Sequence, residues 1–214
     1  MKKIVLPFLF LIITSCIYSQ QASDLFKKSD VKITYLGIDF SKVKLIGSFN
    51  QFAEAGSTGP LLIKNKYFDA WNNIVLNESK KYDVAWIFRK ETIKMDIVEM
   101  SGINSKTELE AIEAEITPKY SVDFIKNHVS NYKFNEKEGF GILFIAESLD
   151  KNAQEGIYHF VILNLKNNEI IIHERLIEHA GGIGLRNYWA RTIFEAILEL
   201  QEVKYKSWKK KYGK

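Results

Sequence analysis

The chain predicts a single α/β (α+β) domain, in which helices pack on a mixed sheet that ends in an antiparallel meander. Its 214 residues are 46% hydrophobic and 13% aromatic, which is enough for one sizeable core. Strand-like and helix-like segments alternate at first, and three strand-like segments then follow one another directly. Consecutive strands usually pair with each other, so these three should form the meander.

The chain begins with the pattern of an export signal. Met1–Lys3 carries positive charge and is followed by the short apolar run Ile4–Ile13, which is too short to span a bilayer as a helix. We therefore assign residues 1–20 to the signal and residues 21–30 to a short polar leader. We expect the protein to be exported to the periplasm or the outer membrane.

The only cysteine, Cys16, leaves two ways of processing this signal open. Ile13–Cys16 resembles a lipobox, in which the cut precedes a cysteine that carries lipid. The alternative is a cut around Ser19–Gln21 that discards Cys16. In both cases the mature protein has no disulfide, so packing must stabilise it.

The expected domain opens with a strand over Val31–Phe40, which Lys42–Gly47 continues after a turn or bulge at Asp39–Ser41. Gly56–Pro60 is a loop, and its proline suits the first turn of a helix that follows. That helix runs over Leu61–Ser79, where apolar residues recur at helical spacing.

The middle of the domain predicts shorter elements. Lys80–Lys90 should hold a short helix with Asp83 as its cap, and Thr92–Met100 alternates like a strand. The acidic stretch from Gly102 to Lys119 fits either a helix or an ordered loop. Ser121–Asn131 should form a helix with a serine cap.

The meander is predicted over Phe140–Leu149, Ile157–Leu165 and Glu169–Glu178, which are rich in β-branched and aromatic residues. An amphipathic helix over Leu185–Lys206 should then lie along the sheet. The domain thus covers residues 31–206, followed by a basic tail over residues 207–214.

The last hairpin also predicts a register. Asn167-Asn168 suits a two-residue type I′ turn, which would pair Leu165 with Ile170 and Ile162 with His173. In that register His159 and His173 point to opposite faces of the sheet and cannot share a metal ion. With no HExxH spacing among the four histidines, we expect no metal site.

Three stretches carry a resemblance to exported proteins. KITYLGIDFS (Lys32–Ser41) and GGIGLRNYWA (Gly181–Ala190), together with the signal, resemble small uncharacterised envelope proteins of Bacteroidetes. The layout around VILNLKNNEIIIHERL (Val161–Leu176) is similar to that of periplasmic lipoproteins that activate penicillin-binding proteins or assemble curli secretion pores. The first resemblance implies an envelope location and no known activity, and the second concerns architecture alone.

Catalytic groups are sparse in the pattern. Cys16 lies in the signal, and no serine sits in a G-x-S-x-G elbow. Two carboxylate pairs are conceivable, Glu147 with Asp150 and Glu174 with Glu178, but charges at strand ends are usually solvated. We therefore assign no catalytic residue.

A glycine cluster precedes the final helix. Gly182 and Gly184 lie where a helix N-terminus could receive an anion, with Arg186 and Asn187 beside them. The place where a dinucleotide motif needs a third glycine is Asn187, and no P-loop lysine follows. Packing of helix on sheet explains the glycines as well, so contact with an anion or a partner stays an alternative here.

Charge is concentrated at the carboxyl end. Without Lys2 and Lys3 the chain has 28 basic and 26 acidic residues, and six of the lysines lie in the last eleven residues. Such a tail can contact an anionic membrane or an acidic polymer, or remain in water at a helix end. Its candidate contact residues are Lys206, Lys209, Lys210 and Lys211.

These observations favour a non-enzymatic envelope protein, lipid-anchored through Cys16 or free, that binds another envelope protein or a surface component. Two alternatives stay open: a hydrolase of envelope polymers that uses a carboxylate pair, and a small-ligand-binding protein with a pocket lined by Trp71, Trp86 or Trp189. We expect no cofactor and no nucleic-acid partner.

Overall fold

The structure is a computed structural model that describes residues 22–27, 30–49 and 59–214. The expected signal, Cys16 and residues 56–58 of the expected loop lie outside the described residues. Within the described ranges, no helix is both long and apolar enough to cross a bilayer.

The sheet is mixed, as the sequence predicts, and β5 (Phe140–Asp150) lies at its centre. Two short strands, β1 (Ile33–Asp39) and β2 (Lys44–Ile46), run parallel to successive halves of β5 on one side. On the other side β6 (Glu155–Asn164) and β7 (Glu169–His179) complete the antiparallel meander. β1 and β2 therefore act as one strand that is interrupted where it passes the middle of β5.

The outer edge of this interrupted strand carries only two-residue partners, β3 (Lys94–Met95) and β4 (Glu113–Ala114). The predicted strand over Thr92–Met100 is wrong beyond β3, because Val98–Asn104 forms helix α4. The chain leaves the sheet at Asp96, whose N–H still donates to Tyr35 O at 2.9 Å. A parallel neighbour of β1 therefore ends early and a helix takes its place.

The first long helix is present as predicted, in three parts: α2 (Gly59–Leu62), the π-helical turn η2 (Ile63–Tyr67) and α3 (Phe68–Asn77). The short helix expected over Lys80–Lys90 is reduced to a 3₁₀ turn, η3 (Trp86–Phe88). The N-cap position of that turn is Ala85 and not Asp83 as predicted, but the Asp83 carboxylate still accepts the Trp86 N–H at 2.9 Å. Arg89 then ends the turn in a left-handed conformation, with φ of 57°.

The remaining helices are α5 (Val122–Val129), α6 (Leu185–Glu199), the π-helical η4 (Leu200–Lys204) and α7 (Tyr205–Tyr212). The hydroxyl of Ser121 caps α5 by accepting the Phe124 N–H, as predicted. The last helix runs six residues past its expected end at Lys206, and Trp208 is buried against Phe160 with ring centroids 5.9 Å apart. Residues 207–212 therefore belong to the domain and do not trail from it.

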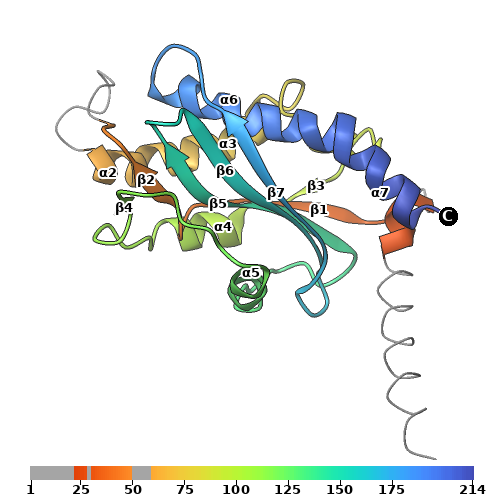
Figure 1. The fold of residues 1–214 in the computed structure, drawn as a ribbon. Helices are drawn as coiled ribbons and strands as arrows, with labels where there is room; N and C mark the ends of the chain where they lie inside the picture. Colours follow the sequence, from red (N-terminus) through yellow and green to blue (C-terminus); the bar gives the residue numbers. More distant parts are fainter. Residues whose placement is uncertain (1–21, 28–29, 50–58) are drawn as a thin grey trace, which may run out of the picture.

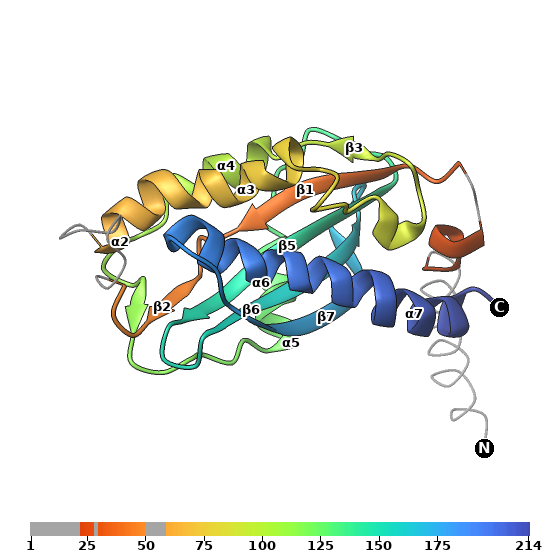
Figure 2. The ribbon, with the colours of Figure 1, turned by 90° about the horizontal axis from the view of Figure 1, so that it is seen from above.

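Helices cover both faces of the sheet (Figure 1). α3 and α6 lie side by side on one face, with α7 at its end, as the view from above shows (Figure 2). α4 and α5 lie on the opposite face (Figure 1). The core under α3, α6 and α7 is the larger one and contains most of the aromatic residues, whereas the core under α4 and α5 is small.

The predicted hairpin register is wrong. Leu163 pairs with Ile170 and Val161 with His173, because the turn has four residues and a bulge follows it. The wider turn buries Leu165. It also places Asn168, with φ of 58°, where its side-chain amide donates to Tyr132 O at 2.8 Å. Tertiary contacts of the turn therefore replace the tight turn that the Asn-Asn pair favours locally.

Candidate functional site

The candidate site begins where β1 ends. Here side chains, and not a neighbouring strand, form hydrogen bonds with the backbone N–H and C=O groups of the sheet edge. The amide of Asn72 on α3 accepts the Ile38 N–H at 2.7 Å and donates to Ile38 O at 2.9 Å. Asn104 on α4 accepts the Phe40 N–H at 2.7 Å and also donates to Ile38 O. Both asparagines are buried and occupy the place of a neighbouring strand. They hold the backbone on both sides of Asp39.

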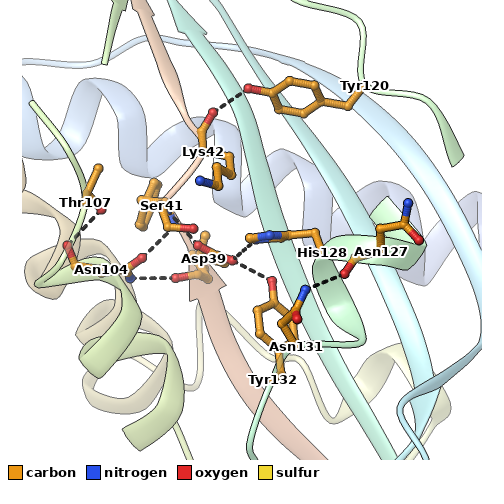
Figure 3. Close-up of polar contacts among 12 residues, drawn as sticks. Asp39, Ser41, Lys42, Asn104, Thr107, Tyr120, Asn127, His128, Asn131 and Tyr132 are labelled. Atoms are coloured by element: carbon orange, nitrogen blue, oxygen red, sulfur yellow. Dashed lines mark hydrogen bonds and ion pairs between the residues drawn. The ribbon is translucent and has the colours of Figure 1, made fainter. Parts of the chain in front are cut away.

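Asp39 is the centre of a first buried polar group, which we call the Asp39 cluster: Asp39, His128 and Tyr132 (Figure 3). One carboxylate oxygen lies 2.7 Å from His128 Nε2 and accepts the Tyr132 hydroxyl, and the other accepts the Ser41 N–H at 2.6 Å. Burial acts to raise the pKa of Asp39, but the hydrogen bond and charge of His128 outweigh it and hold that pKa below 3.8. Both oxygens of Asp39 are thus engaged.

Above the Asp39 cluster lies a groove of about 620 Å³ between the β1–β2 connection, α4 and the end of α5. His128 and Tyr132 line it from α5 and the turn that follows (Figure 3). Four lysines and two glutamates contribute the charged part of its wall: Lys42, Lys44, Lys106, Lys133, Glu99 and Glu108. The groove is therefore positively charged on balance.

Three of these lysines are available to a ligand. Lys42, Lys106 and Lys133 are exposed, and none of them forms an ion pair with a described residue. Lys44 differs, because its ammonium donates to Ala111 O. Ser41 also lines the groove, and its buried hydroxyl has no hydrogen-bond partner among the described residues. A buried hydroxyl without a partner costs free energy, which a ligand that hydrogen-bonds to Ser41 would recover.

A second buried polar group, the Glu147 cluster, crosses the same face of the sheet: Glu147, His159, His173 and Arg175. Glu147 sits at a bulge of β5, fully buried. One of its oxygens accepts from the Arg175 guanidinium; the other lies 2.8 Å from His159 Nε2 and accepts the Tyr120 N–H. Burial acts to raise the pKa of Glu147, but the donors His159 and Arg175 outweigh it and hold that pKa below 4.5.

The histidines of this cluster correct a second prediction, since His159 and His173 lie on one face with Nδ1 and Nε2 2.8 Å apart. The wrong register was the cause, because the bulge shifts His173 by one residue. Glu147 is ionised, so His159 must donate to it from Nε2 and, when neutral, accept from His173 at Nδ1. The geometry therefore determines which atom is the donor in each hydrogen bond: His173 donates to His159, and His159 donates to Glu147.

Tyr120 connects the Glu147 cluster to the groove. Its N–H donates to Glu147, its ring stacks on Phe124 of α5 at 4.3 Å, and its hydroxyl donates to Lys42 O at 2.6 Å at the edge of the groove (Figure 3). Burial, and secondarily the charge of Glu147, raise the pKa of Tyr120 to about 12. The tyrosine is therefore a neutral hydrogen-bond donor at ordinary pH.

Neither predicted carboxylate pair forms. Glu147 is held by Arg175 and His159, whereas Asp150 accepts from Thr117 and from two N–H groups of the next turn. Glu174 pairs with Lys204 at 3.2 Å and accepts from Trp208. The prediction that strand charges are solvated is wrong for Glu147.

A different pair of carboxyl groups comes together between β7 and α6. Burial raises the pKa of Glu178 to about 8, and the neighbouring Glu199 and Glu195 act in the same direction. Glu178 is only 9% exposed, and its Oε1 has no hydrogen-bond partner among the described residues. Glu178 and Glu199 are 21 residues apart in the sequence and lie on different elements, so no local spacing could indicate this pair.

The glycine cluster lies at the start of α6, on the opposite face of the sheet from the groove (Figure 1). Gly182 and Gly184 have positive φ, and Gly184 precedes α6. Arg186 pairs with Glu78 at 2.5 Å, and Asn187 donates to Ile183 O at 3.3 Å. These contacts tie the start of α6 to the end of α3, and a hollow of about 570 Å³ lies beside Gly182 and Asn187.

The three candidate tryptophans are placed apart from the groove. Trp71 and Trp189 are fully buried in the larger core, and Trp86 is half-exposed. Among the described residues, no group of three or more histidine, cysteine, aspartate or glutamate side chains has the arrangement of a metal site. The groove and the two clusters are thus the features with the most chemistry.

Comparisons with known proteins found no matching family model, no similar curated protein and no similar solved structure. The function must therefore be argued from the site itself.

Proposed function

We propose that this protein is an exported, non-enzymatic binding module of the cell envelope, and that its groove receives an acidic segment of another envelope protein or surface component. The observation that carries the proposal is the combination in one groove of three lysines and the buried hydroxyl of Ser41, none of which has an ion-pair or hydrogen-bond partner for its side chain among the described residues. Lysines attract the negative charge, and the hydroxyl fixes the orientation of a polar group at the floor.

The state of the buried carboxylates favours binding over catalysis. Asp39 and Glu147 each use both oxygens to hold neighbouring side chains and N–H groups. Satisfied buried networks make a part of a protein rigid. A rigid floor suits recognition of a ligand, because the floor itself loses little conformational freedom when the ligand binds.

A fluorescent oligoglutamate peptide tests the proposal by polarisation. We expect salt-dependent binding that weakens at least about tenfold in the triple variant Lys42→Gln, Lys106→Gln, Lys133→Gln. The matched control removes the same charge elsewhere: Lys206→Gln, Lys209→Gln, Lys210→Gln. Equal loss in both variants, or none in the first, would contradict the groove as the binding site.

The native partner can then be sought by capture from envelope extracts. Wild-type protein and the groove variant are immobilised in parallel, and bound components are identified by mass spectrometry. We expect an acidic component that the wild type retains and the groove variant loses. Mass spectrometry of the intact exported protein would decide in the same preparation whether Cys16 carries lipid or is removed.

The second candidate is hydrolysis of an envelope polymer by a carboxylate pair. It is favoured by Glu178, whose raised pKa of about 8 keeps a proton next to Glu199, as a general acid requires. Glu178 is packed between β7 and α6, away from the groove, which is why this function is second. Turnover of a glycoside or peptide substrate that is lost in Glu178→Gln but kept in Glu202→Gln would favour it.

A further inference from the structure

The start of the described chain packs against its end. Residues 22–27 are helical, and Ala22 and Leu25 are 1% and 3% exposed. The Phe26 ring lies 5.8 Å from the Tyr205 ring and 6.3 Å from the Tyr212 ring, measured between centroids. Figure 1 shows these residues and α7 together at one end of the molecule. The leader therefore enters the domain directly beside the basic helix.

The helix α7 presents its charge away from the core. Trp208 is buried and its indole N–H donates to Glu174 at 2.9 Å, which fixes the inner side of the helix. Lys206, Lys209 and Lys210 recur at a spacing of three and four residues, so they share another side, and all three are exposed. No acidic residue lies within α7.

Few acidic side chains among the described residues approach the α7 lysines. Lys206 approaches Glu202 only at 3.9 Å, with both side chains largely exposed. Lys209 and Lys211 lie over the Tyr205 and Tyr212 rings at 5.9 and 4.8 Å. Exposed lysines interleaved with tyrosines are the side chains that contact lipid headgroups at a bilayer surface. Lys27, which is exposed on the adjoining helical residues, adds to the same end of the molecule.

We infer that this face, formed by α7 and residues 22–27, binds an anionic lipid bilayer surface. The first described residue is Ala22, and Cys16 is only six residues earlier in the sequence, a span of at most about 20 Å. A lipid on Cys16 would therefore bring α7 to the bilayer, and the lysines would add the second signal that stable anchoring needs. With Cys16 removed, the same lysines act alone.

The orientation has a consequence for the groove. α7 and the leader lie at one end of the molecule, and β2 and β4, near the groove, lie towards the other end (Figure 1). A domain held by α7 leaves the groove open to the periplasmic space or the cell exterior. The inference is independent of the proposed function, because the two surfaces share no residue.

Vesicle sedimentation of the exported protein tests the inference. Phosphatidylcholine vesicles are compared with vesicles that also contain phosphatidylglycerol, at low and high salt. The ratio of binding to the two kinds of vesicle cancels the contribution of any acyl chain. We expect a ratio well above one that falls at least about tenfold in Lys206→Gln, Lys209→Gln, Lys210→Gln, and at high salt.

The groove variant Lys42→Gln, Lys106→Gln, Lys133→Gln is the matched control and should keep the wild-type ratio. A ratio of one for the wild type, or equal loss in both variants, would overturn the inference. The inference would also be overturned if the protein bound oligoglutamate through the α7 lysines but did not bind vesicles, since the surface would then bind an acidic polymer. Circular dichroism of both variants checks that their folds are intact.

Discussion

The two faces of the sheet are built in different ways. Under α3, α6 and α7 the sheet buries a large apolar core in which aromatic rings stack, such as Phe40 on Phe68 at 4.6 Å. Under α4 and α5 the core is small, and the Asp39 and Glu147 clusters occupy much of the space. The first face is stabilised mainly by close packing of apolar side chains, and the second depends more on buried hydrogen bonds. The groove opens on the second face, so the proposed binding site lies on the face that contains the two buried polar clusters.

The largest expected effect is at Glu147. Glu147→Leu should destabilise the protein by about 4 kcal/mol, because Arg175 and His159 lose their buried partner. The double variant Glu147→Leu, Arg175→Met should recover a good part of this loss. Urea denaturation monitored by tryptophan fluorescence measures both. Glu110→Leu, at an exposed position, is the control; a loss as large in the double variant as in the single one would contradict the ion pair as the cause.

A sharper test uses two neighbours on β6 that are both fully buried and face opposite sides. Phe160→Leu keeps an apolar side chain in the large core and should cost about 1 kcal/mol. His159→Leu leaves Nε2 of His173 without its partner and removes one of the two donors to Glu147 Oε2, so it should cost about 3 kcal/mol. Unfolding of the two variants under the same conditions gives the comparison. Equal costs would mean that the faces do not differ in the way we describe.

Acid should weaken the polar face selectively. The folded pKa of Asp39 lies below its ordinary value of 3.8, so ionised Asp39 stabilises the fold above that pH, and this contribution is lost as the pH falls through the folded pKa. Asp39→Asn should therefore cost about 2 kcal/mol near pH 7 and progressively less below pH 3.8. Denaturation across this range measures it. Asp123→Asn, 89% exposed on α5, should show no such trend, and a constant cost for Asp39→Asn would refute the linkage.

The smallest effect concerns Glu178, a buried carboxyl group on the face of the sheet whose core is otherwise mostly apolar. Its folded pKa of about 8 lies above the ordinary 4.5, so its contribution is fully present below 4.5 and is lost as the pH rises towards 8. Glu178→Gln should therefore stabilise the protein by about 1 to 2 kcal/mol above pH 8, with little effect near pH 5. Thermal unfolding at both pH values checks this, with Glu202→Gln as the exposed control. A gain that is the same at both pH values would contradict the assignment.

Part of the candidate site was within reach of sequence reasoning. Glu147 was considered as one of a carboxylate pair and His173 as a metal ligand, and the interruption at Asp39–Ser41 was expected. Asn72 carried a usable signal as well, because it falls on the buried side of a helix beside Trp71. The partners could not be inferred, since His128 and Tyr132 reach Asp39 across 89 and 93 residues.

The sequence by itself determined the mixed α/β class, the final meander and the long helices, because burial of one side of a helix or strand leaves a local period in the chain. Only the tertiary structure decided the hairpin register, the replacement of a strand by α4 and the assembly of both polar clusters. Each of these depends on contacts between distant residues, such as Asn168 with Tyr132, whose free energy outweighs local turn and strand preferences. A pattern of neighbours along the chain contains no record of such contacts.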